Sequence, residues 1–267
     1  MSDGKLVYFA SDFHLGLQGT TPSIARERRI VAWLRSIGPS AGALYLLGDV
    51  FDFWYEYRGV VPKGFVRFLG MLAEFTDAGI PVHIFTGNHD VWMFDYLETE
   101  IGVHVHRRAE TVQLLGHTFY LCHGDGLGPS GMGYKLLRAA FHSYPLQRIF
   151  ATLHPSFAMW LGHTWSHKSR YGKQLTHAFR GAGEPVVQFA TAQEQKTPID
   201  CFVMGHLHMA LIHALPLGGQ LVVLGDWITN DTYATWDGGS LRLMRYKGPD
   251  DAPEELAAAT LPSRGNR

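Results

Sequence analysis

The sequence lacks the features that mark disulfide-stabilised, membrane-spanning and nucleic-acid-binding proteins. Only two of its 267 residues are cysteines, Cys122 and Cys201, and both lie in apolar runs. We therefore expect reduced core thiols in a cytoplasmic protein. No stretch reaches the ~20 apolar residues of a membrane-spanning helix, and the N-terminus shows no signal-peptide pattern. The formal net charge of −1 gives no reason to expect a nucleic-acid partner, and the composition leaves the oligomeric state open.

Acidic residues are absent from one long segment, residues 126–183. Its basic residues are Lys135, Arg138, Arg148, Lys168, Arg170, Lys173 and Arg180. Subtracting these seven from the 23 of the chain leaves 16 basic against 24 acidic residues, so a segment of charge +7 interrupts a body of charge −8. A solvated basic face on ordinary helices would explain this, but a merely soluble surface usually mixes both signs. The segment is also rich in aromatic residues such as Phe141, Trp160 and Trp165, and the combination suits an anionic amphiphile or an anionic membrane surface.

Short apolar runs alternate with amphipathic runs through the first half of the chain. Five apolar runs are predicted to be buried strands: 6–10, 44–47, 82–85, 119–122 and 201–204. The amphipathic segments 21–37 and 64–78 predict helices that end at Gly38 and Gly79. With 46% hydrophobic residues the chain can bury a core as one domain. The order of elements predicts a mostly parallel sheet covered by helices.

Hairpins follow from about residue 109. The predicted pairs are 111–115 with 118–122, 211–215 with 220–224, and 232–236 with 240–246. They predict a second sheet packed on the first, so that residues 1–250 form a single domain interrupted by a helical cap at about 126–183. The segment 251–267 is rich in Pro, Ala, Asp and Glu, and we expect a disordered tail there.

A polar cluster follows each of the five predicted strands. The clusters are Asp12-Phe13-His14, Gly48-Asp49, Gly87-Asn88-His89-Asp90, His123 and Gly205-His206-Leu207-His208. Open α/β folds place their sites on the loops beyond the strand ends, so we expect these side chains to gather at one edge of the sheet. A lone histidine at such a position is more often a core residue than a ligand, and the joint pattern therefore carries the inference.

The clusters supply enough oxygen and imidazole ligands for two metal ions. The candidate ligands are Asp12, His14, Asp49, Asn88, His123, His206 and His208. Two ions ~3.5–4 Å apart need a shared ligand, and a carboxylate with two oxygens is the usual bridge. Asp49 is the candidate for that position. Mixed nitrogen and oxygen ligands without thiolate favour manganese, iron, cobalt or zinc over calcium.

Hydrolysis of a phosphate ester or anhydride is the reaction that such a centre suits. Two divalent ions lower the pKa of a coordinated water and neutralise charge on a phosphoryl oxygen. His89, beside a candidate ligand, could protonate the leaving oxygen or stabilise developing charge. It needs an orienting carboxylate, and Asp52 is the best candidate. A purely structural role for His89 is the alternative.

The motifs Asp-x-His, Gly-Asp-x-x-Asp, Gly-Asn-His-Asp, His-Gly-Asp and Gly-His-x-His, taken in order, resemble those of the calcineurin-like metallophosphoesterases. The resemblance covers about residues 7–210 and implies an α/β fold, a two-sheet sandwich of α-β-β-α layers with an inserted helical cap. It implies that Asp49 is shared between two ions, one held also by Asp12, His14 and His208, the other by Asn88, His123 and His206. In that family the histidine matching His89 assists the leaving group and pairs with the aspartate matching Asp52.

The basic and apolar segment after His-Gly-Asp resembles the cap of the UDP-2,3-diacylglucosamine diphosphatases of lipid A synthesis. Those enzymes cleave the pyrophosphate to give lipid X and UMP, with the acyl chains held between cap and core. The resemblance implies a cytoplasmic enzyme, peripherally associated with the inner membrane, that takes an anionic acylated sugar nucleotide and uses two divalent ions, above all Mn²⁺. It implies substrate contacts from Asn88, His89, Ser166, Arg170, Lys173 and His206.

Two other functions are compatible with the same residues. A metal-dependent phosphodiesterase or phosphatase acting on another nucleotide or phosphorylated lipid would use the same centre. A binding module could keep the metals and recruit partners through its cap, although binding alone would not need Asp52 and His89.

Other polar residues carry less information. The cap histidines could meet phosphate, and the sequence does not select among His142, His154, His163, His167 and His177. Asp226 and Asn230 follow a predicted strand and are expected to cap turns.

Overall fold

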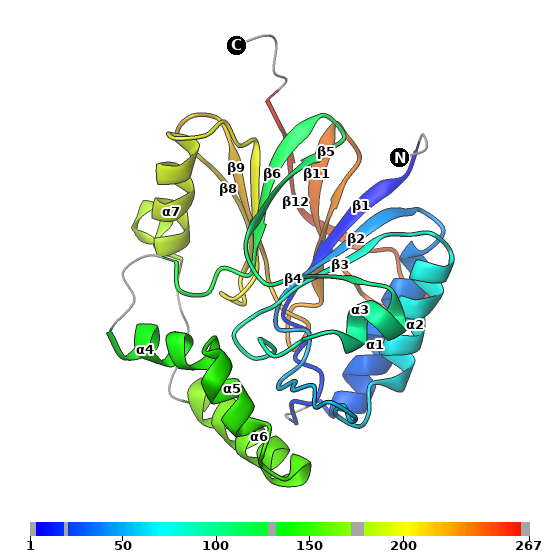
Figure 1. The fold of residues 1–267 in the computed structure, drawn as a ribbon. Helices are drawn as coiled ribbons and strands as arrows, with labels where there is room; N and C mark the ends of the chain where they lie inside the picture. Colours follow the sequence, from blue (N-terminus) through cyan, green and yellow to red (C-terminus); the bar gives the residue numbers. More distant parts are fainter. Residues whose placement is uncertain (1–3, 19–20, 128–131, 172–178, 263–267) are drawn as a thin grey trace.

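Two β-sheets pack face to face, with helices on the outer face of each (Figure 1). The computed structural model describes residues 4–18, 21–127, 132–171 and 179–262, and only the backbone at 132, 134, 135 and 167–171. The predicted sandwich of α-β-β-α layers is confirmed. Within the described ranges, no helix combines the length and the apolar character needed to cross a bilayer.

The first sheet has seven strands in the order β12-β11-β10-β1-β2-β3-β4. Its parallel part consists of β1 (Leu6–Ala10), β2 (Ala41–Leu47), β3 (Val82–Phe85) and β4 (His104–His106). The connecting helices are α1 (Ser23–Ile37), α2 (Val66–Asp77) and α3 (Tyr96–Ile101). The amphipathic pattern places Phe68, Leu72 and Phe75 of α2 against this sheet, and all three are buried.

The second sheet has five strands in the order β5-β6-β7-β9-β8. They are β5 (Glu110–Leu114), β6 (His117–Cys122), β7 (Cys201–Met204), β9 (Gln220–Leu224) and β8 (Ala210–Ala214). The short helix η1 (Gly181–Gly183) leads into α7 (Pro185–Glu194). Val186, Val187 and Ala190 of α7 pack on Phe202 and Met204, so α7 covers the outer face of this sheet.

Successive side chains of a strand point to opposite faces of its sheet, and this divides the core into layers. Val7 and Phe9 of β1 face the second sheet, whereas Tyr8 and Ala10 face the helices. Phe9 stacks on Phe119 of β6, with ring centroids 5.8 Å apart. Because side chains repeat every two residues, the buried runs of the sequence fill two layers at once.

The last predicted hairpin forms, but the expectation that it belongs to the second sheet is wrong. β10 (Thr232–Trp236) and β11 (Ser240–Arg245) pair with each other, and β10 pairs antiparallel with β1 in the first sheet. A hairpin sequence specifies its own turn and register, but not the sheet edge that it joins.

The expectation of a disordered tail is wrong for residues 254–260, and residues 263–267 lie outside the described part of the chain. Glu254–Thr260 forms β12, which pairs antiparallel with β11 at the edge of the first sheet. Leu261 at its end is buried between the sheets, and Leu256 packs against the same cluster. The polar and Ala-rich composition concealed this pairing because only one side of an edge strand has to be apolar.

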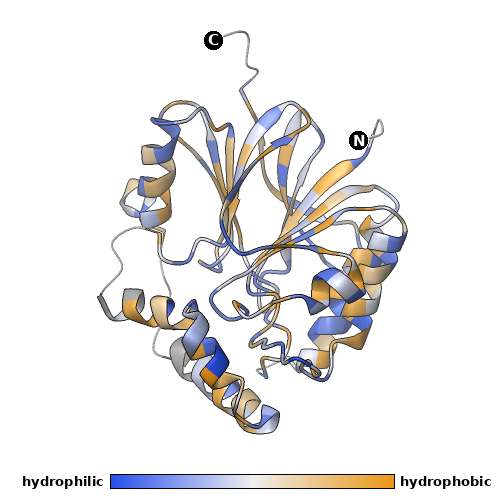
Figure 2. Cartoon of the chain, viewed as in Figure 1, coloured by the Kyte–Doolittle hydropathy of each residue, from blue (hydrophilic) through white to orange (hydrophobic). Residues whose placement is uncertain are grey.

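The cap consists of α4 (Met132–Phe141), α5 (Tyr144–Phe150) and α6 (Pro155–Tyr171), and lies beside the open end of the sandwich (Figure 1). It rests on aromatic residues of the core. Trp92 Nε1 donates a hydrogen bond to the carbonyl of Phe141 (2.8 Å), and Tyr55 donates through its hydroxyl to the carbonyl of Gln147 (2.8 Å). Hydrophobic residues recur along all three helices (Figure 2).

A substitution pair on β11 tests the placement of this strand in the sandwich. Leu243 is fully buried between the sheets, whereas the side chain of its neighbour Arg242 is 46% exposed. We expect Leu243→Ala to lower the free energy of unfolding by about 2–5 kcal/mol because it leaves a cavity. Arg242→Ala, the matched control, should change it by less than about 1 kcal/mol. Equal effects in denaturant unfolding would contradict the assigned register.

Candidate metal centre and active-site cavity

The loops that follow five strands converge at one end of the sandwich. Asp12 and His14 follow β1, Asp49 follows β2, and Asn88 follows β3. The second sheet contributes three histidines beyond β6 and β7: His123, His206 and His208. The carboxyl ends of parallel strands in both sheets point to the same edge, so residues up to 196 positions apart meet there.

A first cluster forms around the carboxylate of Asp12. Its Oδ1 lies 3.5 Å from His14 Nε2 and 3.4 Å from His208 Nε2. These three residues can offer atoms to one ion.

A second cluster forms around the carboxylate of Asp49. Its Oδ2 lies 3.4 Å from His123 Nε2, and His206 completes the group. The same Oδ2 is 3.7 Å from His14 Nε2 in the first cluster. One oxygen therefore lies beside both sets of ligands, which is the position of a bridging carboxylate.

The donor atoms are spaced as ligands rather than as hydrogen-bond partners. Asp12 Oδ1, Asn88 Oδ1 and His123 Nε2 are buried side-chain atoms that, among the described residues, have no hydrogen-bond partner. Buried polar atoms without partners are costly. Ligands bound at about 2.0–2.2 Å to one ion stand roughly 3.0–3.6 Å apart, and the separations at Asp12 and Asp49 are 3.4–3.7 Å. The residues fit two divalent ions.

The backbone at these ligands is strained. Positive φ angles occur at Asp12 (56°), His14 (44°), Asp49 (51°), His206 (68°) and His208 (54°). Such conformations cost non-glycine residues about 1–3 kcal/mol each, and they persist where surrounding contacts impose them. Hydrogen bonds between the loops do so here: His14 N donates to Asp49 O (2.9 Å), and His206 N donates to Asp12 Oδ2 (2.9 Å).

The backbone just before Asn88 approaches Asp49 so closely that this position requires glycine. A Cβ at Gly87 would stand 2.2 Å from Asp49 Oδ1, so no side chain fits there. The buried carboxylate of Asp90 fixes this turn by accepting from Gly87 N (2.7 Å) and Phe51 N (3.2 Å). The loop after β3 is thereby tied to the loop after β2.

The charges of the cluster shift its pKa values. Burial alone would raise the pKa of Asp49, but the positive charges of His123 and His89 outweigh it and hold the pKa well below its usual range. The pKa of Asp12 is lowered against burial, chiefly by His208. Burial, together with the charge of His123, lowers the pKa of His206 to about 4. The carboxylates and the His206 imidazole are thus in the forms that bind metal. The pKa of His123 is raised against burial by the charge of Asp49, so an ion at His123 would displace a proton.

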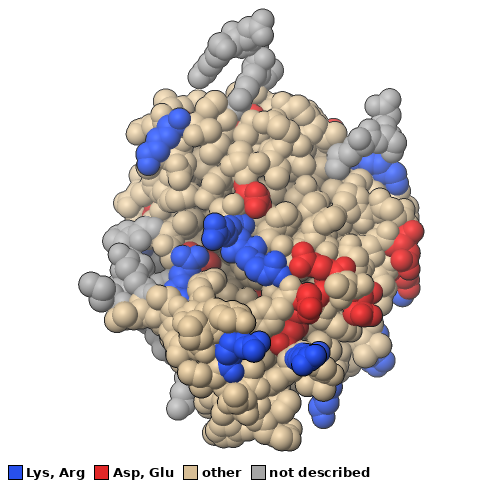
Figure 3. Space-filling view, in the orientation of Figure 1, with Lys and Arg blue, Asp and Glu red and all other residues tan. Residues whose placement is uncertain are grey.

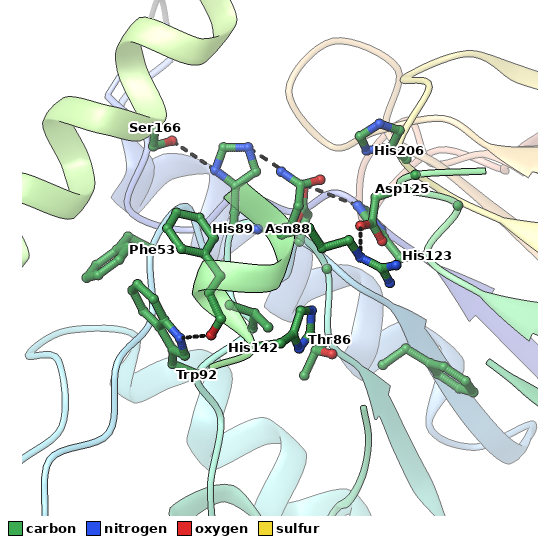
Figure 4. A pocket seen from close by; sticks show the side chains of 18 of the residues that line it. Phe53, Thr86, Asn88, His89, Trp92, His123, Asp125, His142, Ser166 and His206 are labelled. Carbon is green, nitrogen blue, oxygen red and sulfur yellow. Dashed lines mark hydrogen bonds and ion pairs between the residues drawn. The ribbon is translucent and has the colours of Figure 1, made fainter. Parts of the chain in front are cut away.

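His89 lies at the margin of this centre. Its Nε2 is 4.0 Å from Asp49 Oδ2, and its backbone N–H donates to Asp49 Oδ1 (2.9 Å). On its other side, Nδ1 lies 3.2 Å from the backbone oxygen of Asp52 and 3.0 Å from Ser166 Oγ (Figure 4). We expected the carboxylate of Asp52 to hold this ring directly, but the direct contact of Asp52 is made by its backbone.

Comparison with known proteins identifies the family. The sequence model of the calcineurin-like phosphoesterases matches residues 5–210. The chain belongs to the calcineurin-like phosphoesterase family.

Relatives within the family include proteins named UDP-2,3-diacylglucosamine hydrolase. One from Porphyromonas gingivalis is 39% identical over 89% of this chain and 96% of its own length. One from Stenotrophomonas maltophilia is 30% identical over 82% of this chain and 90% of its own length. Among solved structures, a dimetal phosphatase from Danio rerio superposes with a TM-score of 0.53 at 13% identity, covering 97% of this chain and 99% of that one. This last similarity concerns the fold alone.

Asp226 is a site residue of this phosphoesterase that the sequence did not reveal. Its Oδ1 accepts from the N–H groups of Ile228 (2.8 Å) and Thr229 (2.7 Å), as expected of a turn cap. Its Oδ2, however, lies 3.3 Å from Nδ1 of His208. A carboxylate at this position orients a ligating imidazole. The sequence signal for this role is the Gly-Asp pair that follows β9, because the Gly-Asp pair that follows β2 contains a candidate ligand.

A cavity of about 1620 Å³ connects the candidate ligands with the cap. Its wall on the cap side includes Leu137, Phe141, Leu146, Phe150, Leu161 and Trp165. Arg108 also lines it, and within the described part of the chain its guanidinium has neither hydrogen bond nor ion pair. Basic side chains gather around a hollow at the centre of the face drawn in Figure 3.

The three cap residues expected to bind substrate differ in what the structure describes. Ser166 is buried and faces His89. The side chain of Arg170 and the whole of Lys173 lie outside the described residues.

The number of bound metal ions distinguishes the two roles assigned here: Asp49 as a bridging ligand and Asp226 as a residue that orients one histidine. We expect Asp49→Ala to lose both ions, because its Oδ2 lies beside both ligand sets. Asp226→Asn should weaken only one ion, by about 10–100-fold, because it touches His208 alone among the candidate ligands. Bound metal is counted by mass spectrometry after dialysis, with the exposed turn residue Asp237→Asn as control. Loss of a single ion from Asp49→Ala would show that the carboxylate does not bridge.

Proposed function

We propose that this phosphoesterase hydrolyses the pyrophosphate bond of UDP-2,3-diacylglucosamine, giving UMP and 2,3-diacylglucosamine 1-phosphate. One observation supports this above all: a single cavity joins the polar ligand clusters to an apolar wall built by the cap. The substrate has the same two parts, an anionic pyrophosphate and two acyl chains. The relatives named UDP-2,3-diacylglucosamine hydrolase match along most of the chain, cap included.

The size of the cavity favours a substrate larger than a nucleotide. Pockets for small ligands usually measure ~300–1,000 Å³, and this one measures about 1620 Å³. Acyl chains would bury apolar surface against Phe141, Phe150 and Trp165, at roughly 25 cal/mol per Å². A phosphatase for small polar esters would gain nothing from such a wall.

Two divalent ions would be held at the ligand clusters, one by Asp12, His14, Asp49 and His208, the other by Asp49, Asn88, His123 and His206. When bound, they supply a nucleophilic water of lowered pKa and neutralise charge on the phosphoryl oxygens. Manganese is the proposed metal, and iron, cobalt and zinc fit the same donor set, because it combines imidazole nitrogen with carboxylate oxygen and contains no thiolate.

The remaining polar residues of the cavity would hold the substrate. His89 directs Nε2 toward the ligand clusters, where the doubly protonated ring can donate to a phosphoryl oxygen. The guanidinium of Arg108 is available for a phosphate. Asn88 and His206 would contact the phosphoryl group as well as metal, and the cap residues Arg170 and Lys173 would add positive charge for the sugar phosphate.

Product release tests the proposal. Purified protein supplied with Mn²⁺ should release UMP from UDP-2,3-diacylglucosamine, detected by chromatography, and Asp49→Ala should reduce the release to background. A control with UDP-N-acetylglucosamine, which lacks the two acyl chains, should react far more slowly because it leaves the apolar wall unfilled. Turnover of a simple aryl phosphodiester without reaction of the lipid would favour a phosphodiesterase of other specificity, and no turnover of either would favour a binding module.

Membrane association is the second part of the proposal. The cap presents large apolar side chains to solvent, namely Leu136, Tyr144, Ile149, Phe157 and Trp160, each at least 50% exposed. The segment 126–183 that contains them has seven basic and no acidic residues. Exposed apolar residues on a positively charged segment favour the surface of an anionic bilayer. A diacylated substrate would be taken from such a surface, which favours an inner-membrane location for a cytoplasmic enzyme.

Vesicle binding tests this part. We expect Phe157→Ser combined with Trp160→Ser to reduce cosedimentation with phosphatidylglycerol-containing vesicles by about 10-fold or more, because two apolar side chains no longer insert. Val66→Ser is the matched control, since Val66 is 75% exposed and belongs to α2 rather than to the cap helices. Phe157 and Trp160 do not line the cavity, so turnover of a small aryl phosphodiester should be unchanged. Equal vesicle binding by all variants would exclude the cap as the docking surface.

A further inference from the structure

Ser166 of the cap stands between two core residues of the site. Its Oγ donates a hydrogen bond to Asp52 Oδ1 at 2.6 Å and lies 3.0 Å from His89 Nδ1. Ser166 and Asp52 are 2% and 3% exposed, so both contacts are shielded from water. Figure 4 shows the hydroxyl pointing from the cap helix to the imidazole. The carboxylate of Asp52 thus reaches His89 through a residue of the cap.

The direction of these hydrogen bonds fixes the protonated nitrogen of His89. A serine hydroxyl has one hydrogen, and here that hydrogen is donated to the carboxylate. The hydroxyl oxygen must therefore accept from His89, so Nδ1 carries a hydrogen. The backbone oxygen of Asp52, 3.2 Å from the same nitrogen, is also an acceptor and agrees with this assignment. The opposite nitrogen, Nε2, is left to face the ligand clusters.

Two further contacts hold α6 in this position. His163, three residues before Ser166 on the same helix face, places Nδ1 3.3 Å from Asp52 Oδ2, so α6 contacts both oxygens of one carboxylate. Gly162 brings the helix backbone onto the ring of Phe53, where an added Cβ would stand 2.5 Å from the ring atoms. The position of α6 is therefore set by close packing as well as by polar contacts.

We propose that Ser166 is a positioning residue for His89, and that docking of α6 on Asp52 and Phe53 completes the catalytic geometry of the core. The inference rests on the proposed function, in which His89 carries hydrogen on both ring nitrogens, so that Nδ1 donates to Ser166 while Nε2 donates to the phosphoryl group undergoing hydrolysis. It changes the role of Ser166, which the family resemblance assigns to substrate binding. Displacement of the cap would leave the metal ligands in place and His89 without its link to the Asp52 carboxylate.

A double-mutant cycle between Ser166 and His89 tests the proposal. Ser166→Ala should lower kcat about 10–100-fold, as loss of an orienting partner does at other sites, and should change KM much less. In a His89→Ala background the same substitution should change kcat by less than about twofold, because nothing remains to position. Ser166→Thr, which keeps a hydroxyl at this position, should recover most of the rate.

A matched control lies on the same helix. Thr164 donates its hydroxyl to the carbonyl of Trp160 (2.8 Å) and does not line the cavity. Thr164→Ala should therefore leave kcat, KM and the double-mutant cycle unchanged. Thermal unfolding of each variant checks its fold, and Ser166→Cys, close in size but a weak donor, replaces Ser166→Ala in the cycle should the alanine variant unfold.

A spectroscopic measurement gives a readout that does not depend on turnover. In the ¹⁵N spectrum of histidine-labelled, zinc-loaded protein, the His89 signals, assigned by comparison with His89→Ala, should show a protonated Nδ1. In Ser166→Ala they should move toward a mixture of tautomers. Unchanged His89 signals in Ser166→Ala would overturn the proposal.

The kinetic outcomes also separate failure of this inference from failure of the proposed function. The cycle is measured on UDP-2,3-diacylglucosamine and on bis(p-nitrophenyl) phosphate. Additive losses, or a raised KM with unchanged kcat, would assign Ser166 to substrate binding and overturn the inference on either substrate. Absence of UMP release from the lipid by the wild-type protein would refute the proposed function, while the cycle on the aryl ester would still decide the role of Ser166.

Discussion

The buried carboxylate of Asp49 is the constraint on which the rest of the site depends. One oxygen lies within 4 Å of histidines from both sheets, His14 and His123. The other accepts the backbone N–H of His89. An ionised carboxylate with 2% exposure is costly unless it is compensated. The converging imidazoles provide that compensation here, and the two-sheet sandwich is the arrangement that brings them together.

Rigidity of the loops follows from the same constraint. Five candidate ligands have positive φ angles, which isolated loops would not keep. Buried carboxylates outside the ligand clusters connect the loops to one another through hydrogen bonds. Asp90 joins the loops after β2 and β3, and Glu56 accepts from Trp54 Nε1 (2.9 Å) and from three successive backbone N–H groups that begin at Phe94. Strain near the ligands is thus offset by polar contacts of residues that do not themselves bind metal.

The cap contacts the site through a polar side chain and also builds part of the cavity wall. Its helices supply the apolar wall of the cavity, and α6 supplies the hydroxyl that connects Asp52 with His89. The cap docks through hydrogen bonds from Trp92 and Tyr55, which belong to one aromatic cluster, and Trp92 also lines the cavity. In the proposed function, the positively charged cap on a negatively charged body would combine access for an anionic amphiphile with completion of the catalytic geometry.

Much of the fold was readable in the sequence because its signals are local. The strands at 6–10, 82–85 and 201–204 were predicted to the residue, and the helices at 21–37 and 64–78 to within about two residues, whereas α3 and α7 were not predicted. The candidate ligands could also be predicted, since each follows the end of a strand within four residues. The sheet joined by β10 and β11, and the existence of β12, were not readable, because strand partners are chosen by contacts between residues distant in sequence.

The sequence by itself determined which residues can bind metal and that a basic, apolar segment interrupts the domain. Only the tertiary structure decided how that segment meets the site. The sequence predicted only a turn cap at Asp226, whereas the structure places its carboxylate against His208. The sequence did not distinguish His163 from the other cap histidines, but the packing of α6 places it against Asp52. A residue's type fixes the hydrogen bonds it can make, but its partners are fixed by packing, and Ser166 and His89 are 77 residues apart in the chain.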